Sequence, residues 1–172
     1  SEFLSVLNSW GADISTTDLR TERNEPVGTI TVRGGIAPQL KDSNARRLDK
    51  ARIPSLIDEL PLLAVVGSQI PGGIEIRDAS ELRHKESDRL RATAVNLRTM
   101  GAEVEEHPDG LSISGPTNLR GASLDSFGDH RIAMSFSVAA LNADGATEIR
   151  GAECVDISFP EFYKLLHLVV IP

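Results

Sequence analysis

The sequence predicts an α/β protein made of repeated units, with its helices buried and its sheets outside. Residues 58–79 and 129–152 share one layout: an acidic cap, an apolar helix, a glycine turn and a strand that ends in Ile-Arg. A unit of this size cannot bury its apolar helix alone, so it packs against copies of itself. Both helices are apolar nearly all round, which is typical of helices buried on most sides.

Glycine positions predict most of the remaining elements. The stretches "VLNSWGADI" and "NLRTMGAEV" each indicate a helix that ends at a glycine, Gly11 or Gly101, and continues as a strand. The stretch from Thr21 to Arg52 is extra length relative to the repeat, and we expect it to hold a hairpin and a loop. Gly34-Gly35 and Gly72-Gly73 indicate turns, because neither pair has the surroundings of a phosphate-binding loop.

Composition limits the classes of function. The 172 residues carry a formal net charge of −7, which argues against a protein that binds nucleic acids or a membrane surface and favours small-molecule partners. With 172 residues, of which 40% are hydrophobic, the chain has enough apolar material for one domain. One cysteine allows no internal disulfide, and no 18-residue apolar run or signal-peptide pattern is present, so we expect a cytoplasmic protein. Because the chain opens with Ser1-Glu2-Phe3 and no Met, we expect residues 1–3 to be non-native and 4–172 to be a fragment.

The stretch "RHKESDRL", residues 83–90, packs six ionisable side chains in front of a helical apolar pattern. Glu86, Ser87 and Asp88 fit the first turn, where acidic and capping groups stabilise the helix. Lys85 and Arg89 do not fit, because cations are unfavourable there unless an anion lies beside them. Their spacing of four would place them on one helix face. Two interpretations remain open: a phosphate or carboxylate site, or a solvated charged face.

The stretch "FGDHRIAM" repeats this arrangement, with Asp129 as the expected cap and Arg131 in the first turn. Two helix starts that each carry an arginine can converge on one anion. The alternative is that Asp129 only caps the helix and Arg131 only pairs with Asp129. The histidines at 84, 107 and 167 have no metal-ligand spacing with Cys154 or with one another, so we expect no metal site.

Three motifs, "LRHKESDRLRA", "GDHRIAMSF" and "SFPEFY", resemble the C-terminal part of the 5-enolpyruvylshikimate-3-phosphate synthases, the 3-phosphoshikimate 1-carboxyvinyltransferase family. The resemblance implies the inverse α/β barrel-type domain of the enolpyruvyl transferases, built from βαβαββ units. About two units would lie in residues 4–172 as part of one domain, and a second domain would be missing. The implied reaction transfers the carboxyvinyl group of phosphoenolpyruvate to the 5-hydroxyl of shikimate 3-phosphate and releases phosphate, with no metal or organic cofactor.

The resemblance also implies roles for individual residues. Asp58 in "LIDELPLLA" matches the family's proposed proton acceptor for the 5-hydroxyl, and Glu86 matches its proposed proton donor. Four further positions match substrate-binding residues. Lys85 corresponds to a lysine near the shikimate hydroxyls, Arg89 and Arg131 correspond to two arginines that bind phosphoenolpyruvate, and His130 lies beside that site.

Two positions depart from the family pattern. Ile157 stands where many members have a lysine that closes on phosphoenolpyruvate, and Glu81 stands where some have a substrate-contacting asparagine. Two alternative functions remain: a UDP-N-acetylglucosamine enolpyruvyl transferase-like enzyme, which "KESDR" and "DHR" disfavour, and a non-catalytic binding or scaffolding module. We expect the site residues to lie on one exposed face, and the chain alone to fold without turnover.

Overall fold

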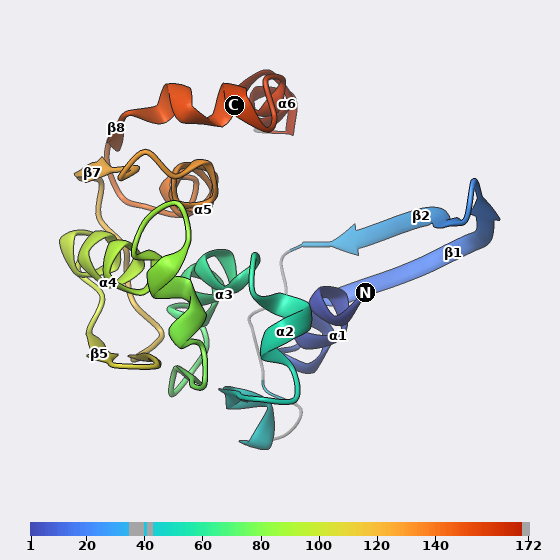
Figure 1. The fold of residues 1–172 in the computed structure, drawn as a ribbon, viewed down its shortest axis with the longest axis horizontal. Helices are drawn as coiled ribbons and strands as arrows, with labels where there is room; N and C mark the ends of the chain where they lie inside the picture. Colours follow the sequence, from blue (N-terminus) through green and yellow to red (C-terminus); the bar gives the residue numbers. More distant parts are fainter. Residues whose placement is uncertain (35–39, 41–42, 170–172) are drawn as a thin grey trace.

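The computed structural model of the protein describes residues 1–34, 40 and 43–169, in which helices and short strands alternate along the chain (Figure 1). The helices are α1 (Glu2–Ser9), α2 (Ile53–Leu56), α3 (Leu60–Gly67), α4 (Arg89–Thr99), α5 (His130–Ala140) and α6 (Phe162–Val169). The strands are β1 (Asp13–Glu22), β2 (Glu25–Arg33), β3 (Arg47–Leu48), β4 (Ile74–Ile76), β5 (Val104–His107), β6 (Gly110–Ile113), β7 (Ser123–Asp125) and β8 (Glu148–Arg150). The 3₁₀ helices are η1 (Ser43–Arg46), η2 (Ser80–His84) and η3 (Ala152–Ile157).

The predicted repeat is present. Apart from the short helices α2 and η2, the elements β3, α3, β4, α4, β5 and β6 follow one another in the order βαβαββ and form a sheet with strand order β3-β4-β6-β5. β3 pairs with β4 in parallel, and β7 pairs with β8 in the same way across α5. The two similar segments that begin near Asp58 and Asp129 therefore both fold as a helix, a turn and a strand, as the sequence predicts.

The helices form the centre of the core. α3 packs against α5, and α4 contacts both. Their buried side chains include Leu63 and Ala64 of α3, Leu97 of α4, and Ile132 and Phe136 of α5, each no more than 1% exposed. The sheet adds one apolar face to this core from β4, β5 and β6, while the alternate residues of these strands point outward.

The hairpin begins earlier than predicted, at Asp13 instead of within the stretch from Thr21 to Arg52. β1 and β2 pair antiparallel around a two-residue turn, in which Arg23 and Asn24 have φ values of 50° and 65°. Such turns match the twist of the flanking strands. The hairpin projects away from the body of the molecule (Figure 1). Of the loop predicted after it, residues 35–39 and 41–42, with Gly35, lie outside the described residues. The rest of the stretch up to Arg52 is not all loop as predicted, because it contains η1 and β3.

The glycine turns agree with the prediction where they are described. Gly11 and Gly101 both have a φ of 96°, just after α1 and α4, and each leads into a strand. Gly72 and Gly73 have φ values of 79° and 70° in the turn before β4. Glycine adopts such conformations without the strain that a Cβ atom causes.

Candidate active site

The start of α4 differs from the sequence prediction. Asp88 is the N-cap and accepts a hydrogen bond of 3.0 Å from the backbone N–H of Arg91, so the helix begins at Arg89. Glu86 therefore lies before the first turn, and Lys85 lies in extended backbone after η2. The prediction that Lys85 and Arg89 share a helix face is wrong, because only one of them is helical. The ammonium of Lys85 pairs with Glu81 instead.

Arg89 is buried, with its side chain only 1% exposed, so the prediction of an exposed cation is wrong. Its guanidinium contacts three carboxylates. Nε donates to Oδ2 of Asp129 at 2.8 Å, Nη1 donates to Oδ1 of Asp58 at 3.0 Å, and Nη2 donates to Oε2 of Glu86 at 2.6 Å. A charge is tolerated at this depth because each edge of the guanidinium has an anionic partner.

The start of α5 contains the expected cap. Oδ1 of Asp129 accepts a hydrogen bond of 2.9 Å from the backbone N–H of Arg131. The Arg131 side chain, however, does not pair with Asp129. Its Nη2 lies 3.2 Å from Oδ2 of Asp58, and its Nη1 lies 3.8 Å from Oε1 of Glu59. The alternative in which Arg131 pairs only with its own helix cap is therefore wrong.

The arginines of the two helix starts both contact the carboxylate of Asp58, and their binding of an external anion stays a prediction. Asp58 lies between α2 and α3, with a side chain 41% exposed. Arg89 holds one of its carboxylate oxygens and Arg131 holds the other. The fold thus brings Asp58, Glu86, Arg89 and Arg131 into one cluster, although they are up to 73 residues apart.

Electrostatics favour the charged form of the buried pair. Burial alone would raise the pKa of Asp129, but the hydrogen bond and charge of Arg89 outweigh it and lower the pKa below its usual value. Burial would likewise lower the pKa of Arg89, and the same contacts with Asp129 raise it. Around these residues, the carboxylates of Asp58, Glu59, Glu86 and Asp129 outnumber the two guanidinium groups by two. A further anion therefore meets no free cation in this cluster.

The other predicted positions lie outside this contact network. The Lys85 side chain is 26% exposed and its ammonium group contacts Glu81. His130 is the first residue of α5 and is partly buried, and no hydrogen bond of its side chain is found in the described part of the chain. Ile157 ends η3 with a side chain that is 85% exposed, so this position offers no charge.

A small cavity of about 180 Å³ opens beside Asp58. Asp58, Glu59 and Arg131 line its polar end. The rest of its wall comes from α3, α5, the start of α6 and the chain just before α6, through Leu62, Met134, Ser135, Val138, Phe159 and Phe162. Phe159 and Phe162 belong to the motif "SFPEFY". All three sequence motifs therefore lie around the same place.

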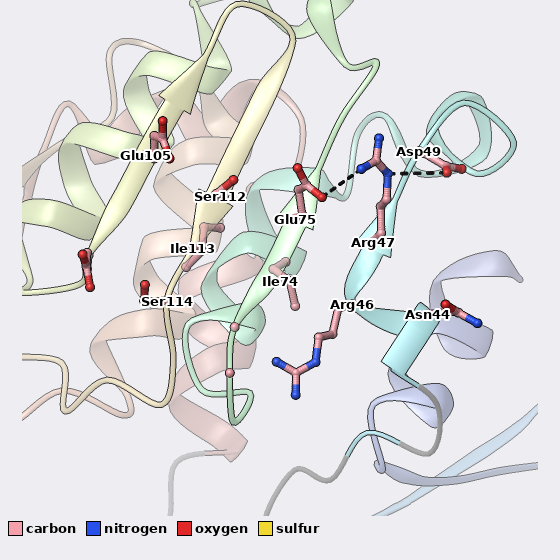
Figure 2. Close-up of a pocket in the computed structure, with 13 residues that line it drawn as sticks. Asn44, Arg46, Arg47, Asp49, Ile74, Glu75, Glu105, Ser112, Ile113 and Ser114 are labelled. Atoms are coloured by element: carbon pink, nitrogen blue, oxygen red, sulfur yellow. Dashed lines mark hydrogen bonds and ion pairs between the residues drawn. The ribbon is translucent and has the colours of Figure 1, made fainter.

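A larger cavity, of about 620 Å³, lies on the outer face of the four-stranded sheet (Figure 2). Glu75, Ser112 and Glu105 pair across β4, β6 and β5, so their side chains project from the same face. Arg47 is held there by Glu75 and Asp49. The wall of this cavity contains none of the predicted site residues, and its charged side chains do not converge on one position. The cluster around Asp58 is the better candidate, because there the charged groups converge.

Sequence reasoning missed three contacts of the site. Glu59 forms an ion pair with Arg131, and the hydroxyl of Ser87 donates a hydrogen bond of 3.0 Å to Asp129. Asp129 also accepts a hydrogen bond from Arg89, in addition to capping its own helix. Only the adjacency of Glu59 to Asp58 was visible in the sequence. The pairing of Asp129 with a residue 40 positions away has no local signal.

Comparison with known proteins identifies the family. Residues 1–166 match the family described as EPSP synthase (3-phosphoshikimate 1-carboxyvinyltransferase). The 3-phosphoshikimate 1-carboxyvinyltransferase of Koribacter versatilis (strain Ellin345) is 51% identical over 167 residues, which are 97% of this chain and 38% of that protein. The corresponding protein of Roseiflexus sp. (strain RS-1) is 49% identical over 163 residues, covering 95% of this chain and 36% of its own length. The chain belongs to the EPSP synthase family.

Solved structures agree with this assignment. An EPSP synthase from Acinetobacter baumannii superposes with a TM-score of 0.87 at 32% identity and covers 96% of this chain, which in turn covers 38% of that protein. The chain thus spans less than two fifths of the length of these relatives. Within residues 1–34, 40 and 43–169, no helix combines the length and the apolar character needed to cross a membrane.

Proposed function

We propose that this chain is the C-terminal part of an enzyme that transfers the carboxyvinyl group of phosphoenolpyruvate to the 5-hydroxyl of shikimate 3-phosphate. Residues 4–172 then belong to one domain, and the second domain comes from the remainder of the enzyme. The observation that carries the proposal is that Asp58 and Glu86 contact the same buried guanidinium, Arg89. The single cysteine, which leaves no internal disulfide, supports a cytoplasmic location.

The reaction needs one group that accepts a proton and another that donates one. The hydroxyl oxygen attacks C2 of phosphoenolpyruvate and gives its proton to Asp58. Glu86, which has to take up a proton before this step, gives that proton to the methylene carbon, and a tetrahedral intermediate forms. The Glu86 carboxylate then takes a proton back from the new methyl group while the bond between C2 and the phosphate oxygen breaks, which releases phosphate and restores the vinyl group. Glu86 is half exposed and Asp58 lines a cavity, so both carboxylates are accessible.

Substrate binding needs cations around a carboxylate and two phosphates. We assign Arg131 and Arg89 to phosphoenolpyruvate, Lys85 to the shikimate hydroxyls, and His130 to the border of the site. Both arginines already have carboxylate partners, so bringing in substrate anions requires additional cations. The remainder of the enzyme would supply them, and we therefore expect weak binding and no turnover by this chain alone.

Phosphate release in the presence of both substrates tests the proposal. The chain is assayed alone and together with the remaining part of the Koribacter versatilis relative, added as a separate chain. We expect turnover only with the added part, and a loss of about 10²–10⁴-fold in the Glu86→Gln variant, the range for removing a general acid. Glu105→Gln is the matched control, because Glu105 is exposed on the outer face of the sheet.

Two outcomes contradict the proposal besides the absence of turnover in the complemented mixture. One is turnover in the complemented mixture that Glu86→Gln leaves unchanged. The other is transfer to UDP-N-acetylglucosamine in place of shikimate 3-phosphate, which would assign the chain to a different enolpyruvyl transferase. Full turnover by the chain alone would show that this domain needs no partner.

A further inference from the structure

Asp129 has more partners than a helix cap requires. Its side chain is fully buried, and both of its carboxylate oxygens accept hydrogen bonds. Oδ1 accepts from the backbone N–H of Arg131 at 2.9 Å and from Nη2 of Arg89 at 3.4 Å. Oδ2 accepts from Nε of Arg89 at 2.8 Å and from the hydroxyl of Ser87 at 3.0 Å. One carboxylate therefore joins the start of α5 to the start of α4.

The guanidinium of Arg89 transmits this restraint to the site. It is planar and rigid, so fixing its Nε edge fixes the directions in which Nη1 and Nη2 donate. Those two nitrogens hold Asp58 at 3.0 Å and Glu86 at 2.6 Å. We propose that Asp129 is a positioning residue that acts through Arg89 to set the places of Asp58 and Glu86. The proposal rests on the function proposed above for these two carboxylates.

A second N-cap in the same chain shows which part of this arrangement is ordinary capping. Asp88 caps α4, accepts from a backbone N–H at 3.0 Å, and pairs with Arg83 at 2.8 Å. Arg83 then reaches Glu106 and the carbonyl oxygens of residues 107 and 108, away from the site. Asp88 and Asp129 are thus both caps with an arginine partner, but only the arginine held by Asp129 contacts the proposed catalytic carboxylates.

The experiment compares Asp129→Asn with Asp88→Asn by NMR of the full 172-residue chain. Asparagine keeps an oxygen for the cap, so both variants retain their helix starts. In Asp129→Asn we expect the Nε proton of Arg89 to exchange with solvent about tenfold faster or more, because its charge-assisted hydrogen bond is lost. The backbone N–H of Arg131 should stay protected. In Asp88→Asn the Nε proton of Arg89 should be unchanged.

Unchanged exchange at Arg89 in Asp129→Asn overturns the proposal, since Arg89 would then be held without Asp129. If Asp129→Asn does not fold, Ser87→Ala provides the test, because it removes a donor to Asp129 while leaving every charge in place. Faster exchange at Arg89 with an intact α5 cap supports the proposal in that variant, and no change overturns it.

The complemented assay adds a functional measurement. We expect Asp129→Asn to lower kcat about 10²-fold, the effect of displacing reacting groups by about 1 Å, while KM for shikimate 3-phosphate, to which Arg89 is not assigned, changes much less. An unchanged kcat would contradict a positioning role even if Arg89 becomes mobile. If the unmodified chain shows no turnover when complemented, the proposed function fails, and the exchange measurement still decides whether Asp129 holds Arg89.

Discussion

Arg89 carries its charge almost out of contact with solvent and meets a carboxylate on each of its donating edges. Asp129, its most buried partner, is fully enclosed. A buried pair of this kind contributes little net stability compared with an apolar pair, but it is costly to break from one side. The two members therefore have to be considered together.

We expect Arg89→Met to lower the free energy of unfolding by about 3–5 kcal/mol, because it leaves Asp129 buried and unpaired. Arg131→Met is the matched control. The Arg131 side chain is 32% exposed, and its partners are partly exposed too, so its loss should cost less than about 1 kcal/mol. Urea unfolding of both variants measures the difference. Equal losses would show that Asp129 does not depend on Arg89.

The pH dependence of stability follows from Asp129. Its pKa in the folded protein is lowered, so the unfolded chain takes up a proton first as the pH falls. The stabilisation from Asp129 is fully present above its unfolded pKa of about 4 and is lost as the pH falls through the lower folded pKa. We therefore expect the stability difference between the unmodified chain and Asp129→Asn to shrink below about pH 4. Urea titrations between neutral pH and acid check this, and a difference that grows in acid contradicts it.

At the scale of single elements, the start of α4 shows what local patterns can predict. The apolar positions Leu90, Ala94 and Leu97 predicted a helix, and all three are buried in α4. The first helical residue was misplaced because several residues in "KESD" can act as a cap, and the choice of Asp88 excludes Lys85 from the helix. Local sequence thus indicated that a helix begins here, but tertiary contacts determine which charges it presents.

The β4–β6 pairing depends on one glycine. A Cβ atom at Gly110 would lie 1.8 Å from the carbonyl oxygen of Ile76, across the strand pair. We expect Gly110→Ala to cost about 1–3 kcal/mol or more, because the neighbouring backbone has to move. At Gly101 a Cβ atom has open space, and only the positive φ opposes it, so Gly101→Ala should cost about 1–2 kcal/mol. Urea unfolding ranks the two variants, and the reverse order would mean that the sheet accommodates the methyl group.

At the scale of the molecule, strand pairing is uneven. β4 has partners on both sides, whereas β1–β2 and β7–β8 are two-stranded sheets. The hairpin exposes Leu19, Ile30 and Val32, all more than half exposed. Backbone hydrogen bonds with few buried contacts open at low free energy. The hairpin is therefore the least protected sheet among the described residues.

Hydrogen–deuterium exchange should separate these sheets. We expect the amides of β1 and β2 to exchange at least about 100-fold faster than those at the centre of β4 and β6, because local opening there exposes little new apolar surface. Mass spectrometry of peptic peptides measures the ratio. Similar protection in both sheets would mean that the hairpin packs against something in solution.

The architecture was more predictable than the site. The similar segments near Asp58 and Asp129 were visible because burial demands apolar residues in both helices. A strand after Gly11 was predicted, but its role as the first strand of the hairpin was missed, because β1 reads "DISTTDLRTE", with few apolar positions to mark its extent. Family motifs named the four residues that the fold brings together, Asp58, Glu86, Arg89 and Arg131, but not their contacts, and they also named Lys85 and His130, which lie outside that cluster. Pairing of Arg89 with Asp129 depends on how α4 and α5 pack, which no local pattern encodes.

The ion pairs of Arg89 and Arg131 with Asp58 have a consequence for ligand selectivity. Because the carboxylate of Asp58 already fills the space between the two guanidinium groups, an incoming anion enters by exchange. Chloride or inorganic phosphate has to break the ion pairs of Asp58 with Arg89 and Arg131 and form equivalent ones with the same arginines. The net gain in binding free energy is therefore small. A ligand that also donates a hydroxyl hydrogen bond to Asp58 replaces part of the interaction that this carboxylate loses when it separates from the two arginines. If this cluster is the substrate site, we therefore expect weak binding of simple ions and stronger binding of ligands that contact both the arginines and Asp58.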